Sequence, residues 1–162
     1  SVSRDIVSNL DYAETFLEAA GVAVPADMQG RSLLPLLRGQ RPSDWRTSFY
    51  YQYYEYPAPH RVRPHYGVVT DRYKLVRFYG VGEDYWELFD NQQDPHELRS
   101  VYGDPAYAKV QQELTAELTR LRKEVKAPET VPPRATISFF TPSMIWSTLS
   151  SLPRLSTMKV AR

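Results

Sequence analysis

The sequence predicts an α+β fold in which a small antiparallel sheet of about four strands packs against a long helix near the C-terminus. Residues 46–90 contain segments rich in β-branched and aromatic residues, separated by proline, glycine and aspartate turns. Between Tyr107 and Val125, apolar residues then recur at steps of three and four with charged residues between them. This second pattern is typical of an amphipathic helix that lies on a sheet. A third observation is a shorter helical pattern at the start of the chain.

The opening pattern predicts a helix over residues 6–20. Gly21 follows directly and is placed to end this helix in a left-handed conformation. The segment 30–39 then carries four leucines around one proline, which suggests a short buried turn docked on a larger body. The apolar positions that line one face of the helix are Ile6, Leu10, Ala13, Leu17 and Ala20.

The central part of the chain predicts the strands. Residues 46–56 contain many tyrosines and favour a strand, and the prolines of residues 57–64 make the next segment a loop. Residues 65–79 have the pattern of a hairpin with its turn near residues 70–72. A further short strand is expected over residues 84–90.

The long helix has a clear start. Asp104 is a good N-cap and Pro105 fits the first helical position, while Pro128 marks the end. From about Ala127 the composition shifts to Ser, Thr and Pro, and no acidic residue follows Glu129. We expect a disordered tail over residues 127–162 rather than a folded element.

Composition excludes several classes of protein. The 162 residues suffice for one modest domain, and a net charge of +1 gives no bulk attraction to nucleic acid or anionic membrane. The chain has no cysteine, which removes disulfides, thiolate metal sites and cysteine nucleophiles. No apolar run approaches the roughly 20 residues that span a bilayer.

Four stretches, in order, carry a family resemblance. They are "NLDYAETFLEAAGVAVPADMQGRSLLPLLRG" (Asn9–Gly39), "HYGVVTDRYKLVRFY" (His65–Tyr79), "WELFDNQQDPHELRSVY" (Trp86–Tyr102) and the helix from Asp104. Together they resemble the C-terminal part of a type I sulfatase of the arylsulfatase-like group, which includes heparan and glucosamine sulfatases. The tail after Ala127 matches nothing in that family.

The resemblance implies a division of the chain and a parent activity. Residues 1–40 would be the end of an alkaline-phosphatase-like catalytic domain, residues 41–126 the C-terminal subdomain, and residues 127–162 a tail. The parent enzyme would cleave sulfate esters or sulfamates with a formylglycine nucleophile and calcium, outside the cytoplasm. We therefore expect this chain to be a piece of a longer enzyme whose partners are the missing N-terminal sulfatase domain and a sulfated carbohydrate.

The resemblance also implies that catalytic groups lie elsewhere. The family makes its nucleophile in a C/S-x-P-S/A-R motif, and the nearest serine candidate, "SLPRL" (Ser151–Leu155), fails by one position. "FDN" (Phe89–Asn91) looks like the Asp-Asn calcium pair but falls at a strand end, where a turn explains it. We expect no catalytic residue and no metal ligand in this chain.

The basic residues around the proline-rich loop are the candidate substrate contacts. In the family the small domain overhangs the mouth of the active site, and imidazole and guanidinium groups suit sugar hydroxyls and sulfate. There are structural alternatives to substrate contact. The histidines could serve to pack the loop, and the arginines could be solvated or could bridge to the absent domain. The candidates are His60, Arg61, Arg63 and His65.

Two other functions compete with the sulfatase interpretation. A stand-alone domain for interaction or carbohydrate binding would hide its apolar surface, whereas a part of a larger enzyme would expose an apolar patch near the first helix and the "SLLPLL" turn. Nucleic-acid binding by the tyrosine-rich basic segment is disfavoured by the net charge and by the lack of an RNA-recognition motif.

Overall fold

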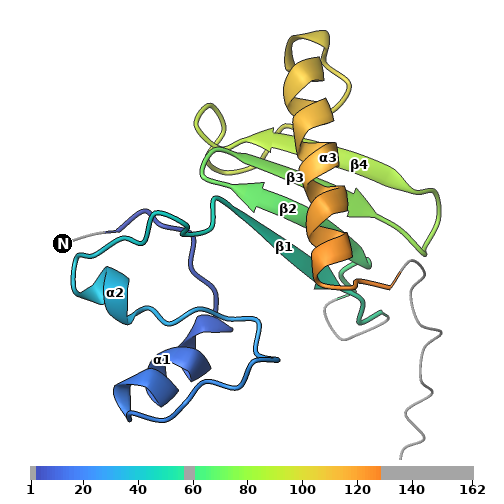
Figure 1. Cartoon of the computed structure of the whole chain (residues 1–162). Coiled ribbons are helices and arrows are strands. Elements are labelled where there is room, and N and C mark those ends of the chain that lie inside the picture. The colour runs from blue at the N-terminus through green and yellow to red at the C-terminus, as the bar shows by residue number, and fades with distance from the viewer. Residues whose placement is uncertain (1–2, 57–60, 129–162) are drawn as a thin grey trace, which may run out of the picture. The chain divides into compact units, whose positions relative to one another are not determined.

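The computed structural model describes residues 3–56 and 61–128. It confirms the predicted α+β fold (Figure 1). The elements follow in the order α1 (Asp11–Ala19), α2 (Leu34–Leu37), β1 (Ser48–Tyr53), β2 (His65–Thr70), β3 (Tyr73–Phe78), β4 (Tyr85–Asp90), a 3₁₀ turn (Pro105–Tyr107) and α3 (Ala108–Glu124).

The four strands form one antiparallel sheet in the order β1-β2-β3-β4. The predicted hairpin is confirmed, because β2 and β3 pair directly and only residues 71 and 72 separate them. The Thr70 hydroxyl closes this turn by accepting a hydrogen bond from the Tyr73 amide at 2.9 Å.

The core lies between α3 and one face of the sheet. Figure 1 shows α3 crossing the strands. Because strand side chains alternate between faces, every second residue of β2 and β3 points toward the helix. The apolar stripe of α3 covers them as its spacing predicts. The buried residues of this core are Tyr66, Val68, Leu75, Tyr79, Leu88, Leu114, Leu118 and Leu121.

The start of the long helix confirms the predicted cap. The Asp104 side chain accepts a hydrogen bond from the Ala106 amide at 2.9 Å, and Pro105 follows in the first turn. That first turn is a 3₁₀ turn, and the α-helix proper begins at Ala108. Arg122 and Lys123 lie in the last turn, where positive charge suits the helix dipole.

Helix α1 differs from its prediction in length and in the face that it buries. It begins at Asp11 instead of Ile6, because the Asp11 carboxylate accepts a hydrogen bond from the Ser8 amide and holds the preceding residues in a turn. Its buried residues are polar: Asp11, Glu14 and Thr15. The end of the helix is as predicted, since Gly21 has a φ of 69°.

The leucine-rich segment is less buried than predicted. Helix α2 contains no buried residue, and the Leu37 side chain is 73% exposed. Packing of α2 against α1 covers only part of its leucines. Exposed apolar residues thus gather around α1 and α2, where a patch was expected.

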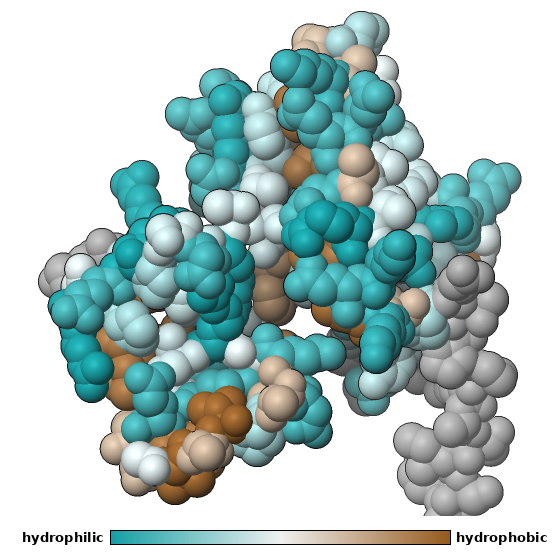
Figure 2. Space-filling model, in the orientation of Figure 1, coloured by the Kyte–Doolittle hydropathy of each residue, from teal (hydrophilic) through white to brown (hydrophobic). Residues whose placement is uncertain are grey.

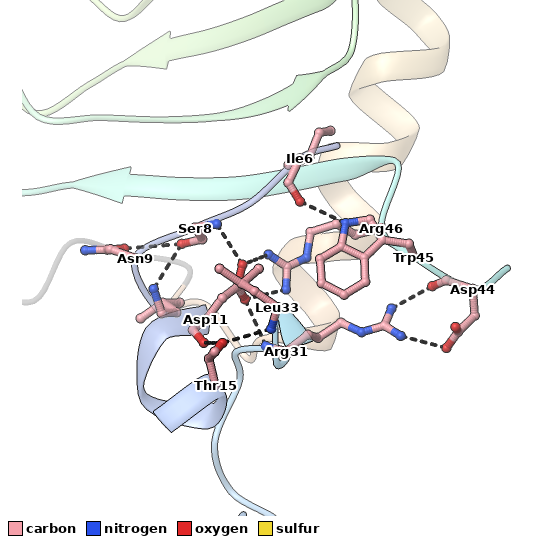
Figure 3. A network of polar contacts seen from close by, with 11 residues as sticks. Ile6, Ser8, Asn9, Asp11, Thr15, Arg31, Leu33, Asp44, Trp45 and Arg46 are labelled. Atoms are coloured by element: carbon pink, nitrogen blue, oxygen red, sulfur yellow. Dashed lines mark hydrogen bonds and ion pairs between the residues drawn. The ribbon is translucent and has the colours of Figure 1, made fainter. Parts of the chain in front are cut away.

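A buried polar network joins the N-terminal segment to β1 (Figure 3). The Asp11 carboxylate is fully buried and forms an ion pair with both terminal nitrogens of Arg46, at 2.6 and 2.7 Å. It also accepts hydrogen bonds from the Ser8 amide at 2.7 Å and the Arg31 amide at 2.8 Å. Four donors therefore compensate the charge of one buried carboxylate.

Trp45 packs beside this ion pair. Its indole nitrogen donates to the Ile6 carbonyl oxygen at 3.0 Å, and its side chain is buried. The guanidinium groups of Arg31 and Arg46 lie 4.9 and 5.2 Å from the ring centroid, within cation–π range. Trp45 and Arg46, just before β1, thus bind the N-terminal segment to the part of the chain that enters the sheet.

Two further expectations concern the ends of the chain and membranes. From residue 129 onward, the predicted tail lies outside the described residues. Among the helices of residues 3–56 and 61–128, none is long and apolar enough to cross a membrane.

Candidate functional site

A row of four aromatic rings crosses one end of the sheet. Tyr53, His65, Phe78 and Tyr85 are direct cross-strand partners on β1, β2, β3 and β4. Consecutive ring centroids lie 5.5, 5.2 and 4.6 Å apart. Because the next residue of β2, Tyr66, faces α3, the row lies on the opposite face of the sheet.

The rings of this row contact one another through their faces. The Tyr53–His65 and Phe78–Tyr85 pairs are stacked, with interplanar angles of 26° and 10°. Each stacked pair therefore covers one face of each of its two rings.

His65 has one ring nitrogen engaged and one available. Its Nδ1 lies 2.8 Å from the Arg63 carbonyl oxygen. A carbonyl oxygen can only accept, so Nδ1 carries a proton in this hydrogen bond, and Nε2 is the other ring nitrogen through which a ligand could be contacted. Within residues 3–56 and 61–128, Nε2 has no hydrogen-bond partner.

Arg63 is held by the chain itself. Its Nη2 donates to the carbonyl oxygens of Val81 and Glu83, the latter at 3.0 Å, and its guanidinium lies 5.0 Å from the Tyr85 ring centroid. Arg63 therefore joins the segment before β2 to the turn before β4. No charge pattern in the sequence could reveal these partners, because they are backbone oxygens.

Arg61 is the exposed cation of the loop. Its backbone adopts a φ of 49°, a left-handed conformation that non-glycine residues rarely take, and its side chain forms no ion pair in the described part of the chain. Arg61, Arg63 and His65 lie on one short segment at the start of β2, and the Arg63 side chain is directed to the turn before β4. His60 lies outside the described residues.

Tyr51 supports the row from the neighbouring position on β1. Its ring meets His65 edge-on at 5.7 Å and lies over Gly67, where a β-carbon would contact it. Burial, followed by the nearby charges of Glu97 and Glu87, raises the pKa of Tyr51 well above its usual range. This hydroxyl stays protonated and neutral at physiological pH.

The other face of the same sheet end holds two arginines that the sequence did not single out. The Tyr66 hydroxyl oxygen accepts hydrogen bonds from Arg77 at 2.9 Å and from Arg122 at 3.0 Å. The Arg122 guanidinium also lies 4.3 Å from the Tyr66 ring centroid. These contacts attach the end of α3 to β2 and β3.

The comparisons with known proteins place this chain in a family. Residues 1–124 match the family described as N-sulphoglucosamine sulphohydrolase, C-terminal. The chain belongs to this sulphohydrolase C-terminal family. The resemblance of four ordered stretches to a sulfatase is confirmed.

Two curated relatives show the range of this family. N-acetylglucosamine-6-O-sulfatase of Bacteroides thetaiotaomicron is 48% identical over 128 residues, which are 78% of this chain and 23% of that protein. The multifunctional alkaline phosphatase superfamily protein PehA of Trinickia caryophylli is 33% identical over 119 residues, 66% of this chain and 22% of that protein. The chain thus spans less than a quarter of the length of either relative.

A solved structure agrees with the fold. The structure of BT4656 in complex with its substrate, D-glucosamine-2-N,6-O-disulfate, superposes with a TM-score of 0.70 at 46% identity. The match covers 74% of this chain and 24% of that one.

The described residues of this family member do not fit a calcium site. Residues 3–56 and 61–128 contain no cluster of three or more His, Cys, Asp or Glu side chains that could hold a metal ion. The Asp90 carboxylate of the "FDN" stretch is buried and bonded to Arg72 at 2.7 and 2.9 Å and to Tyr107 at 3.3 Å. This supports the turn interpretation of that stretch.

Proposed function

We propose that this chain is the C-terminal part of a sulfuric ester hydrolase that acts on sulfated sugars. In this proposal the chain completes the fold of the enzyme and contributes one wall of the substrate pocket. The observation that carries it is the 48% identity to N-acetylglucosamine-6-O-sulfatase over nearly the whole described chain. The loop before β2 supplies side chains of the right chemistry for a sulfated sugar.

Two residues have unused capacity for such a substrate. Arg61 presents an exposed guanidinium, which can form a two-pronged contact with a sulfate or carboxylate group. His65 presents Nε2, which accepts from a sugar hydroxyl when the ring is neutral. His60 remains a predicted contact, and Arg63, whose described contacts all lie within the chain, would act mainly by holding the loop in place.

We assign the nucleophile and calcium to the part of the enzyme outside this chain. The sulfatase resemblance implies both a formylglycine nucleophile and calcium, which would supply the attacking group and stabilise the sulfate charge. The residues described here would bind and orient the sugar and take no part in breaking the sulfur–oxygen bond. The division at residue 40, with residues 1–40 belonging to the catalytic domain, is part of the same proposal.

A chimera tests the substrate contacts. The matching 128-residue segment of the Bacteroides sulfatase would be replaced by that of this chain, and hydrolysis of N-acetylglucosamine-6-sulfate would be measured. We expect His65→Ala and Arg61→Gln each to raise KM several-fold with little change in kcat, because the contacts bind the sugar equally in ground and transition states. Arg99→Gln, also exposed, is the matched control and should change neither.

The isolated chain completes the test. With calcium and an aryl sulfate it should show no turnover, and turnover would refute the assignment of the nucleophile to another part of the enzyme. Sugar binding by the chain alone with the affinity of the intact chimera would favour a stand-alone carbohydrate-binding domain instead.

A further inference from the structure

We propose that Tyr66, Arg77 and Arg122 form a binding site for a sulfate group, which we call the arginine–tyrosine site. Tyr66 and Arg77 are neighbours in sequence of His65 and Phe78, so the site lies at the same end of the sheet as the aromatic row, but on the face that carries α3. The preference of the site for an anion follows from its contacts, whereas the choice of sulfate among anions rests on the proposed function.

The convergence of two arginines on one tyrosine is the first argument. Tyr66 and Arg77 are direct cross-strand partners on β2 and β3, and Arg122 reaches them from the last turn of α3. Both guanidinium groups donate to the same Tyr66 hydroxyl oxygen, Arg77 at 2.9 Å and Arg122 at 3.0 Å. Because like charges repel, two cations held beside one neutral oxygen favour an anion close to them.

The positive charge of the site is only partly compensated in the described part of the chain. Arg77 pairs with the Asp84 carboxylate at 2.8 Å, and the Asp84 side chain is 45% exposed. Arg122 forms no ion pair there, and its second hydrogen bond goes to the Pro128 carbonyl oxygen at 2.9 Å. Two guanidinium groups and one carboxylate leave the site with one net positive charge.

The site also has more hydrogen-bond donors than acceptors. Tyr66 is 6% exposed and accepts from two arginines, so its own hydroxyl hydrogen needs a further acceptor, which the described residues do not supply. Each terminal nitrogen of Arg77 and Arg122 carries two hydrogens and uses one of them in the contacts named above. Within the same residues, the Nε atoms of both arginines are buried without a partner. A ligand that carries negative charge and only accepts hydrogen bonds fits this surplus of donors.

A sulfate group has this chemistry. Its oxygens only accept, and one guanidinium group can donate to two of them at once. The site can be reached from solvent, since the Arg77 side chain is 37% exposed. Figure 2 shows that the visible side of α3 is mostly hydrophilic, which suits a charged ligand at the end of this helix. A free sulfate ion and the sulfate ester of a sugar share this chemistry, so the experiment must separate them.

A titration of the full chain, followed by NMR, tests the site directly. N-acetylglucosamine-6-sulfate would be added to the isotope-labelled chain, and the Nε–H signals of Arg77 and Arg122 would be followed. Both signals should shift and reach saturation, because the anion contacts the guanidinium groups that carry them. N-acetylglucosamine, which lacks the sulfate, should shift neither signal. Inorganic sulfate is the third ligand: weaker binding than that of the sugar sulfate would assign the site to the ester, and equal binding would assign it to the free ion.

Two arginines of α3 provide the variant and its control. Arg122→Gln should weaken the binding of N-acetylglucosamine-6-sulfate, measured at the Arg77 signal, by at least about tenfold, because a charge-assisted hydrogen bond is lost. Arg120→Gln changes the net charge of the chain by the same amount, but Arg120 pairs with Glu117 and Glu124. It should therefore leave the affinity unchanged.

The outcomes separate this site from the substrate contacts proposed above. A wild-type titration without saturable shifts at Arg77 and Arg122 would overturn the proposal, and this result does not depend on the folding of any variant. An affinity that Arg122→Gln leaves unchanged, or that Arg120→Gln lowers equally, would overturn it as well. Normal KM values in the His65→Ala and Arg61→Gln chimeras, together with saturable shifts at the two arginines, would refute those substrate contacts and keep the arginine–tyrosine site.

Discussion

The buried ion pair between Asp11 and Arg46 gives the sharpest prediction. Replacing Asp11 with Asn keeps the shape of the side chain but removes its charge, and it leaves the Arg46 guanidinium, whose side chain is 13% exposed, without its partner. Breaking one partner of a buried pair typically costs about 3–5 kcal/mol. The substitution should destabilise the contact between residues 3–44 and the rest of the chain, because the core of the sheet contains none of these residues.

Native-state hydrogen exchange measures this attachment directly. In Asp11→Asn, the amides of Arg31 and Leu33, which donate to Asp11 and Thr15, should exchange about 10²-fold faster, as a loss of about 3 kcal/mol implies. Amides of the central strands, such as that of Leu75, should change far less, since they belong to the covered core.

A neighbouring pair provides the control. Asp44 pairs with Arg31 at 2.9 Å in the same network, but its side chain is 76% exposed. Asp44→Asn should therefore cost less than about 1 kcal/mol and leave exchange in the N-terminal segment nearly unchanged. Similar small effects of Asp44→Asn and Asp11→Asn would refute the reasoning, and so would a uniform loss of protection across the sheet in Asp11→Asn.

The remaining predictions concern acid stability and the core. The hydrogen bond from Arg120 lowers the pKa of Glu117 from 4.5 to about 2, so Glu117 stabilises the fold above pH 4.5 and this contribution is lost as pH falls toward 2. The free energy of unfolding would be measured in urea at several pH values. Between pH 4.5 and 2 it should fall less steeply in Glu117→Gln than in the wild type, whereas Glu113→Gln should behave like the wild type. A pH dependence in Glu117→Gln equal to that of the wild type would contradict the lowered pKa of Glu117. The Leu118 side chain is 3% exposed and packs against the sheet, so Leu118→Ala should lower the free energy of unfolding by about 2–5 kcal/mol. The control is Gln112→Ala at an exposed position of the same helix, which should lower it by less than about 0.5 kcal/mol. Equal urea midpoints for these two variants would mean that α3 does not cover the core as described.

The strands and the long helix were predictable because local signals determine them. Alternating apolar residues, the Thr70 turn and the Asp104 cap each act over a few positions, and the structure confirms all of them. The spacing of Leu114, Leu118 and Leu121 likewise identified the face of α3 that is buried. Only the element ends shifted, by one to a few residues.

The orientation of α1 and the hydrogen-bond partners of Arg63 could not be predicted in the same way. Both depend on partners distant in sequence: Arg46 lies 35 positions from Asp11, and Val81 lies 18 positions from Arg63. Periodicity shows that a helix has two faces but does not show which face meets the rest of the chain. The candidate loop was found from its residue types, whereas its division into engaged and available groups required the contacts.

The adjacency of His65 and Tyr66 has a consequence for divergence within the family. These neighbours point to opposite faces of β2, one toward the aromatic row and the other toward α3 and its arginines. Under the proposed function, substitutions at the outer positions would change which sugar is recognised, while the inner positions keep the scaffold folded. A single inserted residue in β2 would move the following side chains of the strand to the opposite faces of the sheet, which would expose core residues and destabilise the fold.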